Sequence, residues 1–181
     1  MENTKTTSDD FDWQGHRGAR GILPENSIPG FLLALEYPIK TLELDLAISQ
    51  DEQVIVSHEP WMSAEICKKP DGTPVAESEQ EAIRIFELTY EQIKGYDCGS
   101  RGNPRFAQQQ PMTTYKPSLR DMVQAVENLV AEKEMTPPMY NMEIKSRPRW
   151  DSLYTPVPEK FAQLVLATIA DLGIEERTVI Q

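Results

Sequence analysis

Hydrophobic and polar residues alternate strictly over residues 41–48, which predicts a β-strand with its aliphatic side chains on one face. Glu43 and Asp45 lie on the opposite face, because side chains two residues apart in a strand point the same way. Residues 139–145 repeat the pattern and place Glu143 and Lys145 on one face. The sequence thus predicts two strands that each carry charged side chains on a single side.

The rest of the chain reads as short strands alternating with helices. Further strands are expected at 11–15, 53–58 and 177–181, and helices at 27–35, 77–86, 89–94, 118–133 and 158–172. Ser118 can cap the helix at 118–133, with Asp121 as its acidic capping partner. Gly173 is a suitable stop for the helix at 158–172, because glycine accepts the left-handed conformation that often ends a helix.

Strands that alternate with helices indicate an α/β fold with parallel pairing through right-handed crossovers. An open doubly wound sheet and a closed barrel both fit this order. Charged residues on the inner face of a strand favour the barrel, because an open sheet buries both faces. A complete barrel has about eight strands in roughly 250 residues. We therefore predict a (β/α)8 TIM-barrel type of fold, represented by about its first five strands.

Residues 60–117 interrupt the alternation with a stretch rich in turn-forming residues, and we interpret them as an insertion after the third strand. Such insertions commonly form lids or substrate-contacting loops. The whole of 1–181 is expected to be one domain, incomplete at its C-terminus. Cys67 and Cys98 both lie in the insertion and either form a disulfide, in an oxidising compartment, or remain free thiols. Their spacing does not match a zinc site.

Composition and charge narrow the class of protein. The chain has 39% hydrophobic and 26% charged residues, as is ordinary for a soluble globular domain. Its net charge of −11 argues against nucleic acid as a partner, because such a ligand selects for basic surfaces. No stretch is apolar enough for a transmembrane segment, and residues 1–10 lack a signal-peptide core. We expect a soluble protein, and the sequence leaves open whether it is cytoplasmic or periplasmic.

The polar residues at the predicted strand ends suit metal-assisted cleavage of a phosphate ester. Glu43 and Asp45 are about 7 Å apart along their strand, a span that one cation can bridge. With Glu143 they supply the oxygen ligands that Ca²⁺ or Mg²⁺ prefers. The two histidines of the chain, His16 and His58, suit proton transfer near neutral pH. Taken singly, each of these residues would more often be structural, and only their joint order favours catalysis.

Five ordered blocks carry a family resemblance. They are Gly15-His16-Arg17-Gly18, Pro24-Glu25-Asn26-Ser27, Leu42-Glu43-Leu44-Asp45, Val54-Ile55-Val56-Ser57-His58-Glu59 and Asn141-Met142-Glu143-Ile144-Lys145. In order and spacing they resemble the glycerophosphodiester phosphodiesterase family. Ser27 and Glu59 stand where threonine and aspartate are commoner in that family.

The resemblance implies a (β/α) barrel that hydrolyses glycerophosphodiesters to an alcohol and glycerol 3-phosphate, with one divalent cation, Ca²⁺ or Mg²⁺. By the same resemblance, His16 and His58 are the acid/base pair. The metal ligands would be Glu43, Asp45 and Glu143, while Arg17 and Lys145 would bind the substrate phosphate. Members of the family continue past the last strand of this chain, so we interpret the chain as the N-terminal portion of such an enzyme.

Two alternatives remain from the sequence. One is an inactive or partner-dependent barrel fragment, whose unclosed edges would favour a homo-oligomer. The other is a phospholipase D-like activity on lysophospholipid or sphingomyelin, built on a similar barrel with the same cation.

Overall fold

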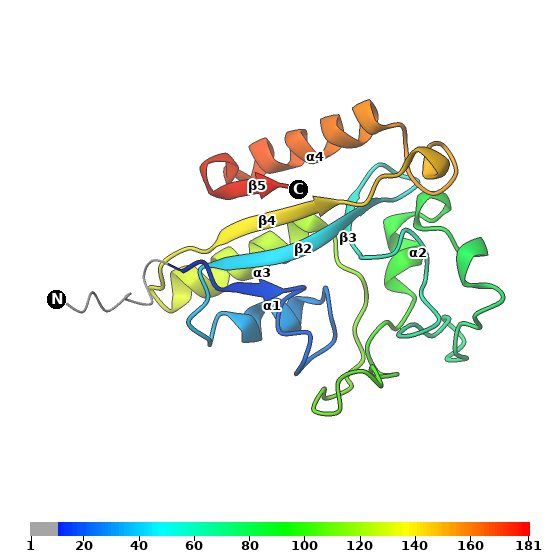
Figure 1. Ribbon diagram of the computed structural model, residues 1–181, viewed down its shortest axis with the longest axis horizontal. Helices are drawn as coiled ribbons and strands as arrows, with labels where there is room; N and C mark the ends of the chain where they lie inside the picture. Colours follow the sequence, from blue (N-terminus) through cyan, green and yellow to red (C-terminus); the bar gives the residue numbers. More distant parts are fainter. Residues whose placement is uncertain (1–10) are drawn as a thin grey trace, which may run out of the picture.

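A five-stranded sheet forms the centre of the computed structural model, which describes residues 11–181 (Figure 1). Strands β1 (Gln14–His16), β2 (Thr41–Ile48), β4 (Met139–Ile144) and β5 (Thr178–Ile180) are parallel and adjacent in the order β1-β2-β4-β5. The predicted strands are thus confirmed, most of them with shorter bounds. The absence of a signal peptide was read from residues 1–10, which lie outside the described residues.

Strand β3 (Val54–Val56) departs from the parallel arrangement, because it pairs antiparallel with β2. The backbone of Ser49 bonds to Gln53 across a tight turn in which Glu52 has a φ of 60°. A connection this short can only form a hairpin, since parallel strands need a crossover of a dozen or more residues.

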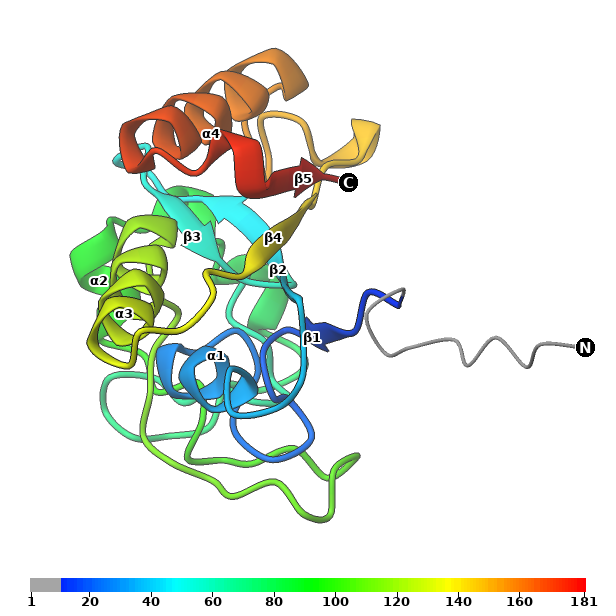
Figure 2. The same ribbon diagram turned by 90° about the vertical axis from the view of Figure 1, so that its left-hand side faces the viewer.

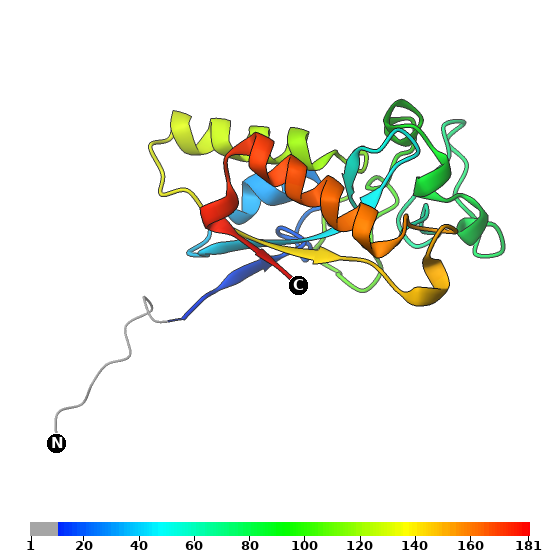
Figure 3. The same ribbon diagram turned by 90° about the horizontal axis from the view of Figure 1, so that it is seen from above.

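Helices α1 (Ile28–Ala34), α3 (Leu119–Glu132) and α4 (Pro158–Leu172) all cover the same face of the sheet (Figure 2 and Figure 3). The leucines of β2 point into this layer and are fully buried against helix residues such as Phe31 and Phe161. Each buried leucine contributes about 1.5–3 kcal/mol of transfer free energy. Helices on one face only, with charged residues on the other, are the arrangement expected of a barrel wall.

The caps of the predicted helices are confirmed with one change. The Ser118 hydroxyl accepts a hydrogen bond from the Asp121 backbone, but the Asp121 carboxylate does not return to Ser118 directly. It accepts instead from the Tyr90 hydroxyl, which in turn accepts from the Ser118 backbone amide. Gly173 ends α4 with a φ of 66°, as expected.

Residues 57–117 gather at the end of the sheet where β2 and β4 terminate (Figure 1). They contain α2 (Tyr90–Lys94), which Thr89 caps in a capping box, and the 3₁₀ turns η2 (Gln80–Ala82) and η3 (Ile85–Glu87). Two further 3₁₀ turns lie elsewhere, η4 (Pro148–Trp150) and η5 (Glu175–Arg177). No described helix is long and apolar enough to cross a membrane.

The prediction of a helix over 77–86 is wrong. The Met62 amide donates to the carbonyl of Ile83, and the Ile85 amide donates to the carbonyl of Pro60. This backbone pairing between 60–62 and 83–85 replaces the bonds that a continuous helix would make, so that only the short 3₁₀ turns remain. A tertiary contact therefore overrides the local pattern.

A second hydrophobic cluster joins the 57–117 segment to Ala47 of β2 and Ile55 of β3, and it contains a disulfide between Cys67 and Cys98. Both cysteines are buried, with exposed fractions of 0% and 4%. The bond closes a loop with a sequence separation of 31, in a region with little regular secondary structure. The disulfide lowers the conformational entropy of the unfolded chain and thereby stabilises a segment with little regular secondary structure.

We expect the double variant Cys67→Ser/Cys98→Ser to lose about 3–4 kcal/mol of unfolding free energy, the entropy of a loop of this length. Urea unfolding of the variant beside the oxidised wild type measures the difference, and wild type kept reduced should match the variant. A loss below about 1 kcal/mol would mean that the bridge does not hold this segment.

Candidate active site

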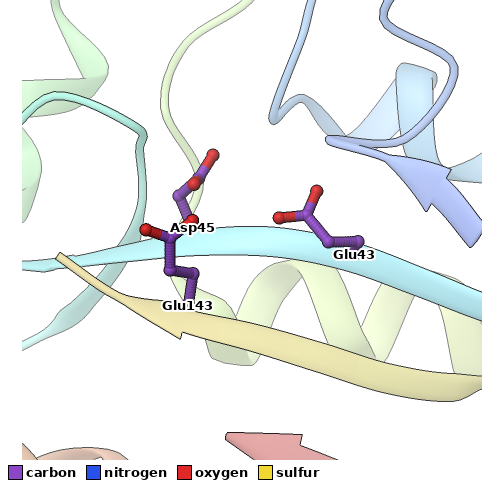
Figure 4. A group of neighbouring side chains, drawn as sticks. All are labelled: Glu43, Asp45 and Glu143. Atoms are coloured by element: carbon purple, nitrogen blue, oxygen red, sulfur yellow. The ribbon is translucent and has the colours of Figure 1, made fainter. Parts of the chain in front are cut away.

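Strand register brings the predicted site residues together at one end of the sheet. In the pairing of β1 with β2, His16 lies opposite Glu43, and in the pairing of β2 with β4, Asp45 lies opposite Glu143. The three carboxylates rise from the same side of the two strands (Figure 4). One oxygen from each lies within 4.8 Å of the others. The alternation of β2 therefore produces a compact oxygen-lined cluster.

Glu43 and Asp45 are buried but differ in their electrostatic surroundings. Burial raises the pKa of Glu43, and the nearby charge of Asp45 adds to this effect. Burial also acts to raise the pKa of Asp45, but a hydrogen bond from Asn26 and the cationic side chains around it lower the pKa overall. The Asn26 Nδ2 lies 2.9 Å from the Asp45 Oδ2. Hydrogen-bond donors and cations thus stabilise the charge of Asp45, whereas burial disfavours the charge of Glu43.

Arg17 is held by the site through both its backbone and its side chain. Its backbone amide donates to the Glu43 Oε2 at 2.8 Å. Its guanidinium lies 2.9 Å from Glu25 and 3.1 Å from Asp45. Arg17 takes a φ of 53°, a conformation that costs energy for a residue with a side chain. The expected contact of Arg17 with a substrate phosphate stays a prediction.

Gly18 fixes the turn that presents Arg17. Its φ is 75°, and a Cβ there would lie 2.8 Å from the backbone of Gly30 in α1. Only glycine fits between the loop and the helix, so the first block of the sequence motif is partly a packing requirement.

Lys145 bridges two of the clustered carboxylates. Its ammonium nitrogen lies 3.0 Å from the Asp45 Oδ1 and 2.6 Å from the Glu143 Oε1. The Lys145 side chain is 13% exposed. This position agrees with the predicted proximity of Lys145 to the site.

His16 sits at the rim of the cluster. Its Nε2 lies 3.8 Å from the Glu43 Oε2, and its side chain is 58% exposed. Partial burial and the neighbouring charges of Arg20 and Arg17 lower the pKa of His16. A neutral imidazole, with one unprotonated nitrogen, is therefore favoured near pH 7.

His58 is paired with the residue that follows it. Its Nδ1 lies 2.6 Å from the Glu59 Oε1. Although burial opposes ionisation, the His58 hydrogen bond and the charge of Lys116 bring the pKa of Glu59 to about 2. An ionised carboxylate only accepts hydrogen bonds, so the proton lies on Nδ1 of His58. The Nε2 atom is then the nitrogen available for proton exchange.

A cavity of about 970 Å³ opens beside this pair, with Glu59 in its wall. Trp61, Glu77 and Arg101 also line it. The ring of Trp61 packs edge-on against Tyr154, with 5.3 Å between the ring centroids. The 57–117 segment thus provides a hollow with the carboxylate partner of His58 in its wall.

Four residues of the site were given no role by the sequence. Three of them, Glu25, Asn26 and Glu59, belong to the sequence blocks named above. Their proximity to the site could have been inferred from those blocks, but their hydrogen-bond partners could not. Asn26 takes a φ of 51°, which asparagine tolerates better than most residues. Lys116 comes at the end of an irregular segment and had no sequence signal, because its contacts depend on how that segment returns to β3.

Comparison with known proteins places the chain in a family. A model described as the glycerophosphoryl diester phosphodiesterase family matches residues 16–156. A glycerophosphodiester phosphodiesterase of Caldanaerobacter subterraneus subsp. tengcongensis is 28% identical over 165 residues, which cover 91% of this chain and 55% of that protein.

Solved structures agree on the fold. A Silicibacter pomeroyi DSS-3 protein, provisionally named a glycerophosphoryl diester phosphodiesterase, is 26% identical with a TM-score of 0.79, over 92% of this chain and 56% of that one. An Oleispira antarctica phosphodiesterase, solved with the product sn-glycerol-3-phosphate, is 20% identical with a TM-score of 0.63, over 94% of this chain and 56% of that one. At that identity the likeness concerns the fold alone.

The chain spans just over half the length of the Caldanaerobacter and Silicibacter proteins. Its parallel sheet with helices on one face is part of the TIM-barrel type of fold of these structural neighbours. Since the family model covers most of the sequence, this chain belongs to the glycerophosphoryl diester phosphodiesterase family.

Proposed function

We propose that the chain carries the site of a metal-dependent phosphodiesterase that hydrolyses glycerophosphodiesters to glycerol 3-phosphate and an alcohol. The observation that carries this proposal is the strand register that gathers the oxygens of Glu43, Asp45 and Glu143 within 4.8 Å, beside His16. The family match supports the class of reaction.

The carboxylate cluster fits a divalent cation. Its donors are all oxygens, which suit Ca²⁺ or Mg²⁺ and do not separate the two ions. Burial raises the pKa of Glu43, and the charges of Asp45 and Glu143 add to this effect; a bound cation would offset that charge. A bound cation would neutralise charge on the non-bridging phosphate oxygens and polarise the phosphoryl group.

The two histidines divide the proton transfers in this proposal. His16, whose pKa is lowered, is the base that takes a proton from the attacking hydroxyl. His58 is its partner and acts as the acid in its imidazolium form: the Nε2 proton goes to the leaving alkoxide, while the Nδ1 proton stays hydrogen-bonded to Glu59. Arg17 and Lys145 are the cations that we assign to the substrate phosphate, and each also pairs with carboxylates of the site.

The cavity beside Glu59 supports a small polar alcohol as the other half of the substrate. Its walls include charged side chains such as Glu77 and Arg101. Such charged walls suit a polar alcohol better than the acyl chain of a lysophospholipid or sphingomyelin. We propose residues 60–117 as the insertion that forms this alcohol site.

A partner-dependent fragment is the competing interpretation. Strands β1 and β5 each have one strand neighbour in the sheet, and Val179 and Ile180 on β5 are 54% and 42% exposed. Exposed edges of this kind favour association. Under this alternative, specific activity should rise with protein concentration, as a homo-oligomer forms.

The central test is release of glycerol 3-phosphate from glycerophosphoethanolamine. We expect release that a chelator abolishes and added Ca²⁺ or Mg²⁺ restores. His16→Ala and His58→Ala should each lower the rate at least about 100-fold, because acid/base catalysis contributes 10²–10⁴-fold. Arg120→Ala, an exposed change on α3, is the control with an unchanged rate.

Two outcomes would contradict this proposal. Release that persists in chelator would remove the metal from the reaction. Retention of more than roughly a tenth of the rate in His16→Ala would exclude its acid/base role.

The Glu59 carboxylate predicts a specific acid sensitivity. Its pKa is about 2 in the folded chain, against an ordinary value of 4.5. A depressed pKa stabilises the fold above the ordinary value, and that stability is lost as pH falls from 4.5 towards 2. Glu59 should thus contribute on the order of 2 kcal/mol at pH 6 that disappears by about pH 2, allowing for its partial exposure.

Urea unfolding of wild type and Glu59→Gln at pH 6 and at about pH 2.5 checks this expectation. The variant should lose less stability than wild type between the two pH values, whereas Glu91→Gln, at an exposed ion pair on α2, should behave as wild type. Equal losses in wild type and Glu59→Gln would mean that Glu59 is not held ionised by its surroundings.

A further inference from the structure

Lys116 is a buried cation that the proposed reaction leaves without a role. The residue is 4% exposed, and its Nζ lies 2.8 Å from the Ser57 hydroxyl. Among residues 11–181, no carboxylate forms a direct ion pair with it. Burial lowers the pKa of Lys116, and the charges of nearby carboxylates, with Glu59 first among them, oppose that shift. A buried ammonium with one neutral partner is costly, so its position calls for an electrostatic explanation.

The fold brings Lys116 to this place through backbone pairing. The Val56 amide donates to the Pro117 carbonyl at 2.8 Å, and Ser118 forms an antiparallel bridge with Ile55. The end of the 57–117 segment therefore runs along β3, directly beside the residues that follow this strand. This pairing places Lys116 next to Ser57, the residue that precedes His58.

Ser57 forms hydrogen bonds with Lys116, with Glu59 and with Asp45 of β2. The Ser57 hydroxyl accepts from Lys116 and donates to the Glu59 carbonyl at 2.6 Å. The Ser57 amide donates to the Asp45 carbonyl at 2.9 Å. His58 lies between the two tied residues, so the turn that carries its imidazole is fixed at both ends.

We propose that Lys116 is a positioning residue for His58, acting through the Ser57 hydroxyl and through its charge facing Glu59. The Ser57 link holds the 57–59 turn in place, and the ammonium favours the ionised Glu59 that accepts from His58 Nδ1. The charged groups that face Glu59 are His58, Lys116 and Arg17. This inference rests on the proposed role of His58, and it deepens that role by naming what orients the imidazole.

The first readout is independent of activity. The chain has two histidines, so ¹⁵N-histidine labelling gives two ring spectra, which His16→Ala assigns. In wild type, His58 should show the Nδ1–H tautomer with a slowly exchanging proton. In Lys116→Met, the Nε2–H tautomer should appear and the Nδ1 proton should exchange rapidly.

A matched control is available in the same segment. The Lys68 Nζ lies 2.7 Å from the Ser100 hydroxyl, a contact of the same kind away from His58. Lys68→Met should leave the His58 ring spectrum unchanged. Should Lys116→Met fail to fold, Ser57→Ala removes the link while keeping the charge, and the same change in tautomer is expected.

The second readout is kinetic. We expect Lys116→Met to lower kcat at least about tenfold, part of the 10²–10⁴-fold that acid/base catalysis supplies, while KM changes less than about threefold. An inactive wild-type chain would contradict the proposed function, and the tautomer measurement would still decide the role of Lys116. A folded Lys116→Met, or Ser57→Ala in its place, with the wild-type His58 spectrum would overturn this inference.

Discussion

Compensation of buried negative charge is the constraint on which this structure depends. Strand register brings oxygens of three carboxylates on β2 and β4 to within 4.8 Å of one another. At such separations, like charges in a low-dielectric environment destabilise the fold unless cations or donors offset them. Arg17 and Lys145, from distant parts of the chain, are the cations that contact this cluster. Lys116 acts on a neighbouring carboxylate, that of Glu59. The contacts that stabilise the fold are therefore also the contacts that arrange the site.

This requirement explains why the loop after β1 and the turn after β3 are so closely tied. Arg17 accepts an unfavourable backbone conformation and thereby directs its amide to Glu43 and its guanidinium to Asp45. Glu59 is ionised at almost any pH because His58 and Lys116 surround it. The same loops hold Nδ1 of His58 against Glu59, and burial with the charges of Arg20 and Arg17 lowers the pKa of His16.

Much of this arrangement could be predicted from the sequence. The alternation over 41–48 determined both the strand and the shared face of Glu43 and Asp45, because a period of two leaves no other assignment. The rest depends on tertiary contacts that no local pattern encodes. The helix expected over 77–86 yields to backbone pairing with 60–62, and Lys116 reaches the site only because its segment returns along β3. The sequence left the state of Cys67 and Cys98 open, and the structure joins them.

The most direct test of this account is calorimetric titration of the chain with Ca²⁺ and with Mg²⁺, beside Glu43→Gln. The account predicts one bound cation per chain and an affinity that falls at least about tenfold in the variant, since loss of one charged ligand removes 1.4 kcal/mol or more. Cation binding should also raise the unfolding temperature of the wild type. The assignment of the carboxylate cluster as the metal site would be contradicted if neither ion bound. It would also be contradicted if Glu43→Gln bound the ions with the affinity of the wild type.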